Sequence, residues 1–101
     1  MKYNKLIRDK IPEIIKQDNK IPIIHIAENQ EYWTKLKEKL IEETNEFINE
    51  PTQEELADIL EVIDAICDFK HFNKQNLIHT KHQKAIKRGK FQKRIILDEV
   101  E

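Results

Sequence analysis

Five acidic residues in two neighbouring motifs are the side chains of this sequence best suited to chemistry. The first motif contains Glu42, Glu43 and Glu46, and the second contains Glu55 and Asp58. On a helix, which turns by about 100° per residue, Glu43 falls inside the apolar sector and Glu46 lies at the edge of that sector. A carboxylate directed at a core is costly unless something pairs with it. Mg²⁺ binds through such oxygens and completes its shell with waters and substrate phosphates.

Two long helices joined by a tight break must position these carboxylates. Residues 29–49 form the first expected helix, a proline ends it, and a Thr-x-x-Glu capping box starts the second. In an antiparallel hairpin with this break, Glu46 lies level with Glu55, and Glu43 lies level with Asp58. Four converging carboxylates repel one another and raise their pKa values unless they share a cation. The spacing therefore predicts a divalent metal site between the two helices.

A simpler interpretation of the acidic residues stays open at this point. Glutamate is a strong helix former, and glutamate-rich helices are commonly solvated surface. Glu55 also has a local role, as the partner of Thr52 in the capping box. A further pair with i, i+3 spacing, Glu61 and Asp64, falls on the opposite flank of its helix. We keep these two residues as secondary candidates, for a second ion or for the base of a nucleotide.

The remaining elements are also mostly helical. A short helix is expected to begin near Ile11, with a proline in its first turn, and a third long helix spans about residues 74–88 before the sole glycine, Gly89. Residues 21–26 and 91–98 are extended in pattern, and a minor two-stranded pairing between them is the one sheet element that we expect. The fold class is therefore predicted to be all-α, a helical bundle in one domain covering residues 1–101.

Composition narrows the classes of protein further. The chain has 101 residues, a formal net charge of −1 and 37% charged residues, which fits one domain rich in solvated helices. This net charge gives no argument for a nucleic-acid or membrane partner, so we expect neither. One cysteine permits no intramolecular disulfide, and neither a signal-peptide pattern nor an 18-residue apolar stretch is present. We expect a cytoplasmic protein.

The acidic motifs lead to a family resemblance. Glu42-Glu43-x-x-Glu46 followed by Glu55-x-x-Asp58 resembles the EExxE…ExxD signature of the MazG-like, all-α nucleoside triphosphate pyrophosphohydrolases. Residues 3–13 and 87–97 are similar to the two ends of a compact branch of that superfamily, related to phosphoribosyl-ATP pyrophosphohydrolase, so the resemblance covers nearly the whole chain. The gap between the carboxylate motifs is shorter than in larger members. Gly89-Lys90 also stands where a double glycine is common.

The resemblance implies an enzyme that cleaves a nucleoside triphosphate, with ribose or deoxyribose, between the α- and β-phosphates to a monophosphate and pyrophosphate, a reaction suited to clearing the nucleotide pool. It implies that Glu43, Glu46, Glu55 and Asp58 bind Mg²⁺, for which Mn²⁺ is a possible substitute. Glu42 is the weaker member, and with Glu43 it is the candidate for orienting the attacking water. Bound Mg²⁺ neutralises phosphate charge and activates water, while a free carboxylate accepts the proton.

A triphosphate also needs cationic side chains. The candidates are Lys5 and Arg8 near the start of the chain, and Arg88, Lys93 and Arg94 near its end. The arginines lead over the lysines because a guanidinium can hold phosphate oxygens with two hydrogen bonds. A solvated basic face is the alternative for each of them.

Partners and a competing function complete the expectations. We expect a homodimer or a higher homo-oligomer, because the apolar stripes are too wide for a two-helix hairpin to cover. The competing hypothesis is a non-catalytic helical interaction or regulatory module. Its basic segment, residues 81–94, in which seven of 14 residues are Lys or Arg, would bind nucleic acid or an acidic partner.

Overall fold

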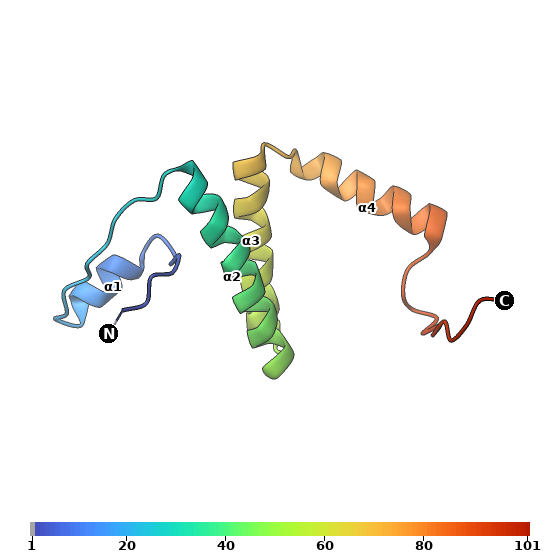
Figure 1. The fold of residues 1–101 in the computed structure, drawn as a ribbon, viewed down its shortest axis with the longest axis horizontal. Coiled ribbons are helices and arrows are strands. Elements are labelled where there is room, and N and C mark those ends of the chain that lie inside the picture. Colours follow the sequence, from blue (N-terminus) through green and yellow to red (C-terminus); the bar gives the residue numbers. More distant parts are fainter. Residues whose placement is uncertain (1) are drawn as a thin grey trace.

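The protein is a chain of four helices. The computed structural model describes residues 2–101, and within them it contains α1 (Ile11–Gln17), α2 (Asn29–Asn49), α3 (Gln53–Lys70) and α4 (Lys74–Arg88), with no strand (Figure 1). The predicted all-α class is confirmed. No helix in the described part of the chain is both long enough and apolar enough to cross a membrane.

Local side-chain chemistry sets the helix ends. The break after α2 coincides with Pro51, and α3 begins where Thr52 Oγ1 accepts a hydrogen bond from the Glu55 amide at 3.2 Å. At the start of α4, Asn73 Oδ1 accepts from the Asn76 amide at 3.0 Å. The chain leaves α3 through His71, whose φ of 60° is left-handed, so the direction changes sharply before α4.

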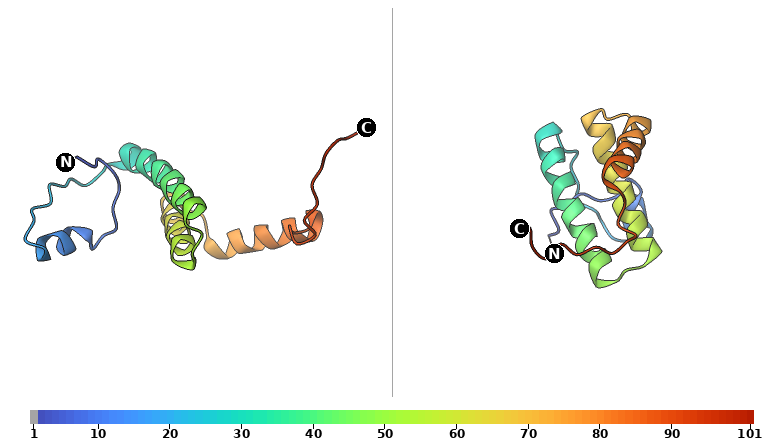
Figure 2. Two further views of the ribbon diagram at one scale, coloured as in Figure 1. Left: turned by 90° about the horizontal axis from the view of Figure 1, so that it is seen from below. Right: turned by 90° about the vertical axis from the view of Figure 1, so that its right-hand side faces the viewer.

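The core lies between α2 and α3, which pack side by side as a hairpin (Figures 1 and 2). Leu36 of α2 and Val62 and Cys67 of α3 are its buried apolar residues. Glu43 of α2 is a charged residue that is also buried, with 8% of its surface exposed. This hairpin therefore contains the buried core of the described residues.

The expected pairing of residues 21–26 with residues 91–98 is wrong. Neither segment is a strand, and they lie at opposite ends of the molecule, beside α1 and beyond α4 (Figure 1). Their side chains are largely free, with Ile23 96% and Phe91 98% exposed. The physical reason is that two separate helices, α1 and α4, lead these segments away from the hairpin in different directions. In addition, Pro22 cannot donate a hydrogen bond to a ladder.

The molecule is elongated rather than compact. Its radius of gyration is 18.1 Å and its principal extents are 61 × 31 × 25 Å, whereas a compact domain of this length has a radius of about 13 Å. Helix α4 projects from the top of the hairpin (Figure 1). Its apolar side chains Leu77, Ile78 and Ile86 are exposed to solvent. Within residues 2–101 the buried apolar side chains all belong to the hairpin, and the apolar surface of α4 is uncovered in a single chain.

Candidate metal centre

The α2–α3 hairpin brings carboxylates from both helices together. Glu43, Glu55 and Asp58 each place one oxygen within 4.8 Å of the others. Glu42, Glu43 and Glu46 form a second group by the same measure. We call the first set the interhelical triad and the second the α2 triad. Glu43 belongs to both triads and therefore connects them.

Glu43 is the most buried of these acids. Its Oε2 is buried without a hydrogen-bond partner, and so is Oε2 of Glu55. Burial raises the pKa of Glu43, and the nearby charge of Glu46 raises it further. Burial also raises the pKa of Glu55, helped by the charge of Asp58. Two buried, unpaired carboxylate oxygens in one triad are unfavourable without a cation, and oxygen donors of this kind suit Mg²⁺ or Mn²⁺.

The four ligands predicted from the sequence are divided between the two triads. Glu43, Glu55 and Asp58 share the interhelical triad, whereas Glu46 groups with Glu42 and Glu43 and is exposed. Glu46 still lies near Glu43 of the interhelical triad, because its charge raises the pKa of Glu43. The structure therefore places Glu46 in the α2 triad and not in the interhelical triad.

Lys39, which was not among the sequence candidates, lies within the acidic cluster. Its Nζ is 3.1 Å from Glu42 Oε2 and 3.4 Å from Glu43 Oε1, and its side chain is only 16% exposed. Lys5 Nζ donates to the other oxygen of Glu42, Oε1, at 3.1 Å. Burial alone would raise the pKa of Glu42, but the hydrogen bonds from Lys39 and Lys5 outweigh burial and lower it. The i, i+3 and i, i+4 spacing of Lys39 to these acids was the signal that could have identified it.

The N-terminal segment reaches the same cluster. Arg8 Nη2 donates to Asp58 Oδ1 at 2.6 Å, and Arg8 Nη1 lies 3.7 Å from Glu61 Oε1. Lys35 of α2 holds the segment from the other side by donating to the Asn4 carbonyl at 2.8 Å. Two of the predicted phosphate-binding residues, Lys5 and Arg8, thus lie beside the carboxylates.

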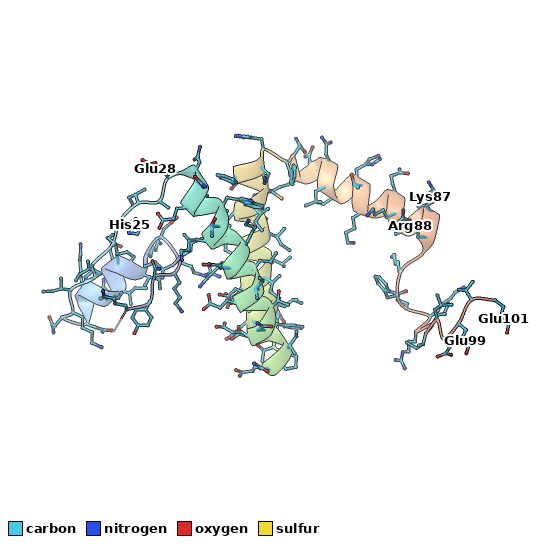
Figure 3. All side chains as sticks on the ribbon, viewed as in Figure 1. His25, Glu28, Lys87, Arg88, Glu99 and Glu101 are labelled. Carbon is cyan, nitrogen blue, oxygen red and sulfur yellow. The ribbon has the colours of Figure 1, made fainter. Side chains whose placement is uncertain are left out.

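The other predicted residues lie elsewhere. Asp64 Oδ1 lies 3.7 Å from Lys74 Nζ of α4, Glu61 Oε1 lies 3.7 Å from Arg8 Nη1, and neither acid belongs to a triad. Figure 3 shows Arg88 and Lys87 at the far end of α4, away from the hairpin. Lys93 and Arg94 follow beyond α4, and α4 projects away from the hairpin. A single chain therefore does not bring its C-terminal cations to the carboxylates.

Comparisons with known proteins give neither a family nor an activity for this chain. No family model and no solved structure matches the chain. A curated protein of Mycolicibacterium smegmatis (strain ATCC 700084 / mc(2)155), described as an uncharacterized protein, is 44% identical over 41 residues, which are 41% of this chain and 42% of that protein. The match thus spans less than half of that relative's length, and its description names no activity.

Proposed function

We propose that this protein is a Mg²⁺-dependent nucleoside triphosphate pyrophosphohydrolase of the MazG-like type, which converts a nucleoside triphosphate and water into a monophosphate and pyrophosphate. One observation carries the proposal: the buried, unpartnered oxygens of Glu43 and Glu55 belong to one triad with Asp58. The reaction is proposed from the resemblance of the acidic motifs to the signature of that family, and the arrangement of the carboxylates across the hairpin supports a cation there.

Each residue has a defined task in this proposal. Glu43, Glu55 and Asp58 would bind the Mg²⁺, with Glu46 near enough to join them. Bound Mg²⁺ supplies charge neutralisation for the phosphates and a water of lowered pKa. Glu42, whose pKa is lowered by its hydrogen bonds from Lys39 and Lys5 against the effect of burial, would orient the attacking water.

The cations beside the cluster complete the site. Arg8 is 55% exposed and bonded to Asp58, and exposed pairs of this kind contribute only about 0–1 kcal/mol. Arg8 can therefore leave Asp58 for a phosphate group at little cost. Lys5, which pairs with Glu42 at the same edge, would bind the same anionic group.

We further propose that the active form is a homodimer or a higher oligomer. Apolar side chains are exposed on α3 and α4, including Leu56, Leu60, Ile78 and Ile86. A second copy would cover such a surface. It would also offer a route for the C-terminal cations of one chain to reach the carboxylates of another. Light scattering at micromolar concentration should give at least twice the mass of one chain, and a monomer at that concentration would contradict this part of the proposal.

The reaction is tested by product analysis. Purified protein is incubated with Mg²⁺ and a panel of canonical and modified ribo- and deoxyribonucleoside triphosphates, and the products are separated. We expect monophosphate and pyrophosphate from at least one substrate, and no turnover in Asp58→Asn. Glu54→Gln is the matched control, because Glu54 is an exposed acid in the first turn of α3. Release of diphosphate and orthophosphate would exclude the proposed bond cleavage.

A second candidate function is favoured by the position of α4. The basic segment, residues 81–94, covers the second half of α4 and the chain after it. It projects from the hairpin and is largely exposed, as a binding surface for nucleic acid or an acidic partner would be (Figure 1). Titration with labelled RNA and DNA at low and high salt separates the two functions. Salt-dependent binding without Mg²⁺-dependent turnover would favour an interaction module, whereas turnover without binding would favour the enzyme.

A further inference from the structure

The two carboxylate triads share Glu43 but differ in what their oxygens contact. In the interhelical triad, Oε2 of both Glu43 and Glu55 is buried without a partner. In the α2 triad, both oxygens of Glu42 accept hydrogen bonds from ammonium groups, those of Lys5 and Lys39. Two oxygens of the interhelical triad, one on Glu43 and one on Glu55, therefore have no cationic partner, whereas both oxygens of Glu42 in the α2 triad have one.

Lys39 is well suited to a permanent place in the α2 triad. It lies one turn before its acidic partners on the same helix, so its position depends on helix geometry and not on the N-terminal segment. Its side chain is mostly buried, and a buried ammonium group is stable only when it is paired. Its Nζ contacts one oxygen each of Glu42 and Glu43, as a cation bridging the two carboxylates would.

The cationic side chain that contacts the interhelical triad at Asp58, Arg8, is more exposed than Lys39. Asp58 is paired with Arg8, whose side chain is 55% exposed and belongs to a segment outside the hairpin. Such a pair is weak and can exchange with a metal ion. The unpartnered oxygens of Glu43 and Glu55 have no protein cation to displace.

We propose that Lys39 takes the place of a second divalent cation, so that the chain binds one metal ion, in the interhelical triad, and uses the Lys39 ammonium group to bridge Glu42 and Glu43 of the α2 triad. This inference rests on the proposed metal site and specifies its stoichiometry. Removal of the ammonium group would leave three carboxylates of the α2 triad within reach of one another, with Glu43 available as a bridge between two ions. Two-metal sites of enzymes have ions about 3.5–4 Å apart.

The test counts Mn²⁺ ions in the full chain without nucleotide. Equilibrium dialysis gives the number bound, and electron paramagnetic resonance detects the dipolar broadening of two nearby Mn²⁺ ions. We expect one Mn²⁺ per chain for the unaltered protein and for Lys39→Arg, which keeps the charge. We expect two ions with dipolar broadening for Lys39→Met. Lys39→Gln is measured in parallel, so that the result does not depend on the folding of one variant.

Lys35→Met is the matched control. Lys35 lies one turn before Lys39 on α2, and its side chain is similarly buried, but its Nζ contacts Glu38 and the Asn4 carbonyl instead of either triad. This variant should bind one ion. If the unaltered protein binds no Mn²⁺, the metal site itself is wrong. If it binds one ion and both neutral Lys39 variants also bind one, the role of Lys39 is refuted while the metal site stands. Two ions in the unaltered protein would likewise refute it.

Discussion

Replacing Glu43 by glutamine should stabilise the metal-free protein while abolishing its response to Mg²⁺. Glu43 is 8% exposed and has one oxygen with no partner, and a buried unsatisfied polar group costs about 1–3 kcal/mol. Glutamine keeps the shape, removes the negative charge beside Glu46 and adds an N–H donor. Lys39 keeps its pair with Glu42, and the amide oxygen of glutamine can still accept from the Lys39 ammonium group. We therefore expect Glu43→Gln to gain about 1 kcal/mol in EDTA, which corresponds to roughly 4–8 °C in Tm for a domain of this size.

The assay is thermal unfolding followed by circular dichroism, at one protein concentration, in EDTA and in excess Mg²⁺. A free metal concentration of 100 times Kd stabilises a binding protein by about 2.7 kcal/mol. The unaltered protein should show that rise in Tm, and Glu43→Gln should not. Glu54→Gln, the exposed control, should behave like the unaltered protein in both conditions. A Glu43→Gln variant that is less stable than the parent in EDTA, or that still responds fully to Mg²⁺, would refute the reasoning.

Three other predictions follow from the same contacts. Because the pKa values of Glu43 and Glu55 are raised in the folded state, folding takes up protons, so the Tm in EDTA should rise as pH falls from 7 toward 5. A flat profile over that range would contradict the raised pKa values. Thr52→Ala should lower the free energy of unfolding by about 1 kcal/mol, since it removes the cap of α3. Urea unfolding measures this loss, with Thr80→Ala as the exposed control. Equal losses in the two variants would exclude a capping effect. Arg8→Gln should tighten Mn²⁺ binding in the absence of nucleotide, because Asp58 loses a competing cation. The same variant should raise the KM for the triphosphate. Calorimetry measures the first effect and steady-state kinetics the second, and an unchanged KM would show that Arg8 does not bind phosphate.

The sequence was sufficient for the hairpin and its acidic cluster because both follow from local rules. Thr52 caps α3 as its spacing to Glu55 indicates, and a break at Pro51 puts the acidic motifs of two helices at matched heights. The level of a residue along the helix axis, however, does not determine which way its side chain points around that axis. Glu46 is level with Glu55 but lies at the edge of the apolar sector, which is why it groups with the acids of its own helix.

The contacts that the sequence did not reveal are of two kinds. Lys39 is close to its partners along α2, but a lysine among acids on a helix surface normally indicates a solvated ion pair, and its burial depends on the packing of the hairpin. The Arg8–Asp58 pair joins residues 50 positions apart, and no local pattern specifies such a pair. The failed strand pairing has the same origin, since the directions of α1 and α4 decide whether residues 21–26 can meet residues 91–98.

The attachment of the N-terminal segment to the hairpin has a consequence for the conditions in which the protein works. Lys5 and Arg8 bind Glu42, Asp58 and Glu61 at the solvent-facing edge, and Lys35 binds the backbone of Asn4. Dissolved ions weaken exposed pairs far more than enclosed ones. A rise in ionic strength should therefore loosen this segment first and leave the Lys39–Glu43 pair in place. The contacts of the N-terminal segment with the carboxylates would then respond to the salt content of the surroundings, while the Lys39–Glu43 pair would not.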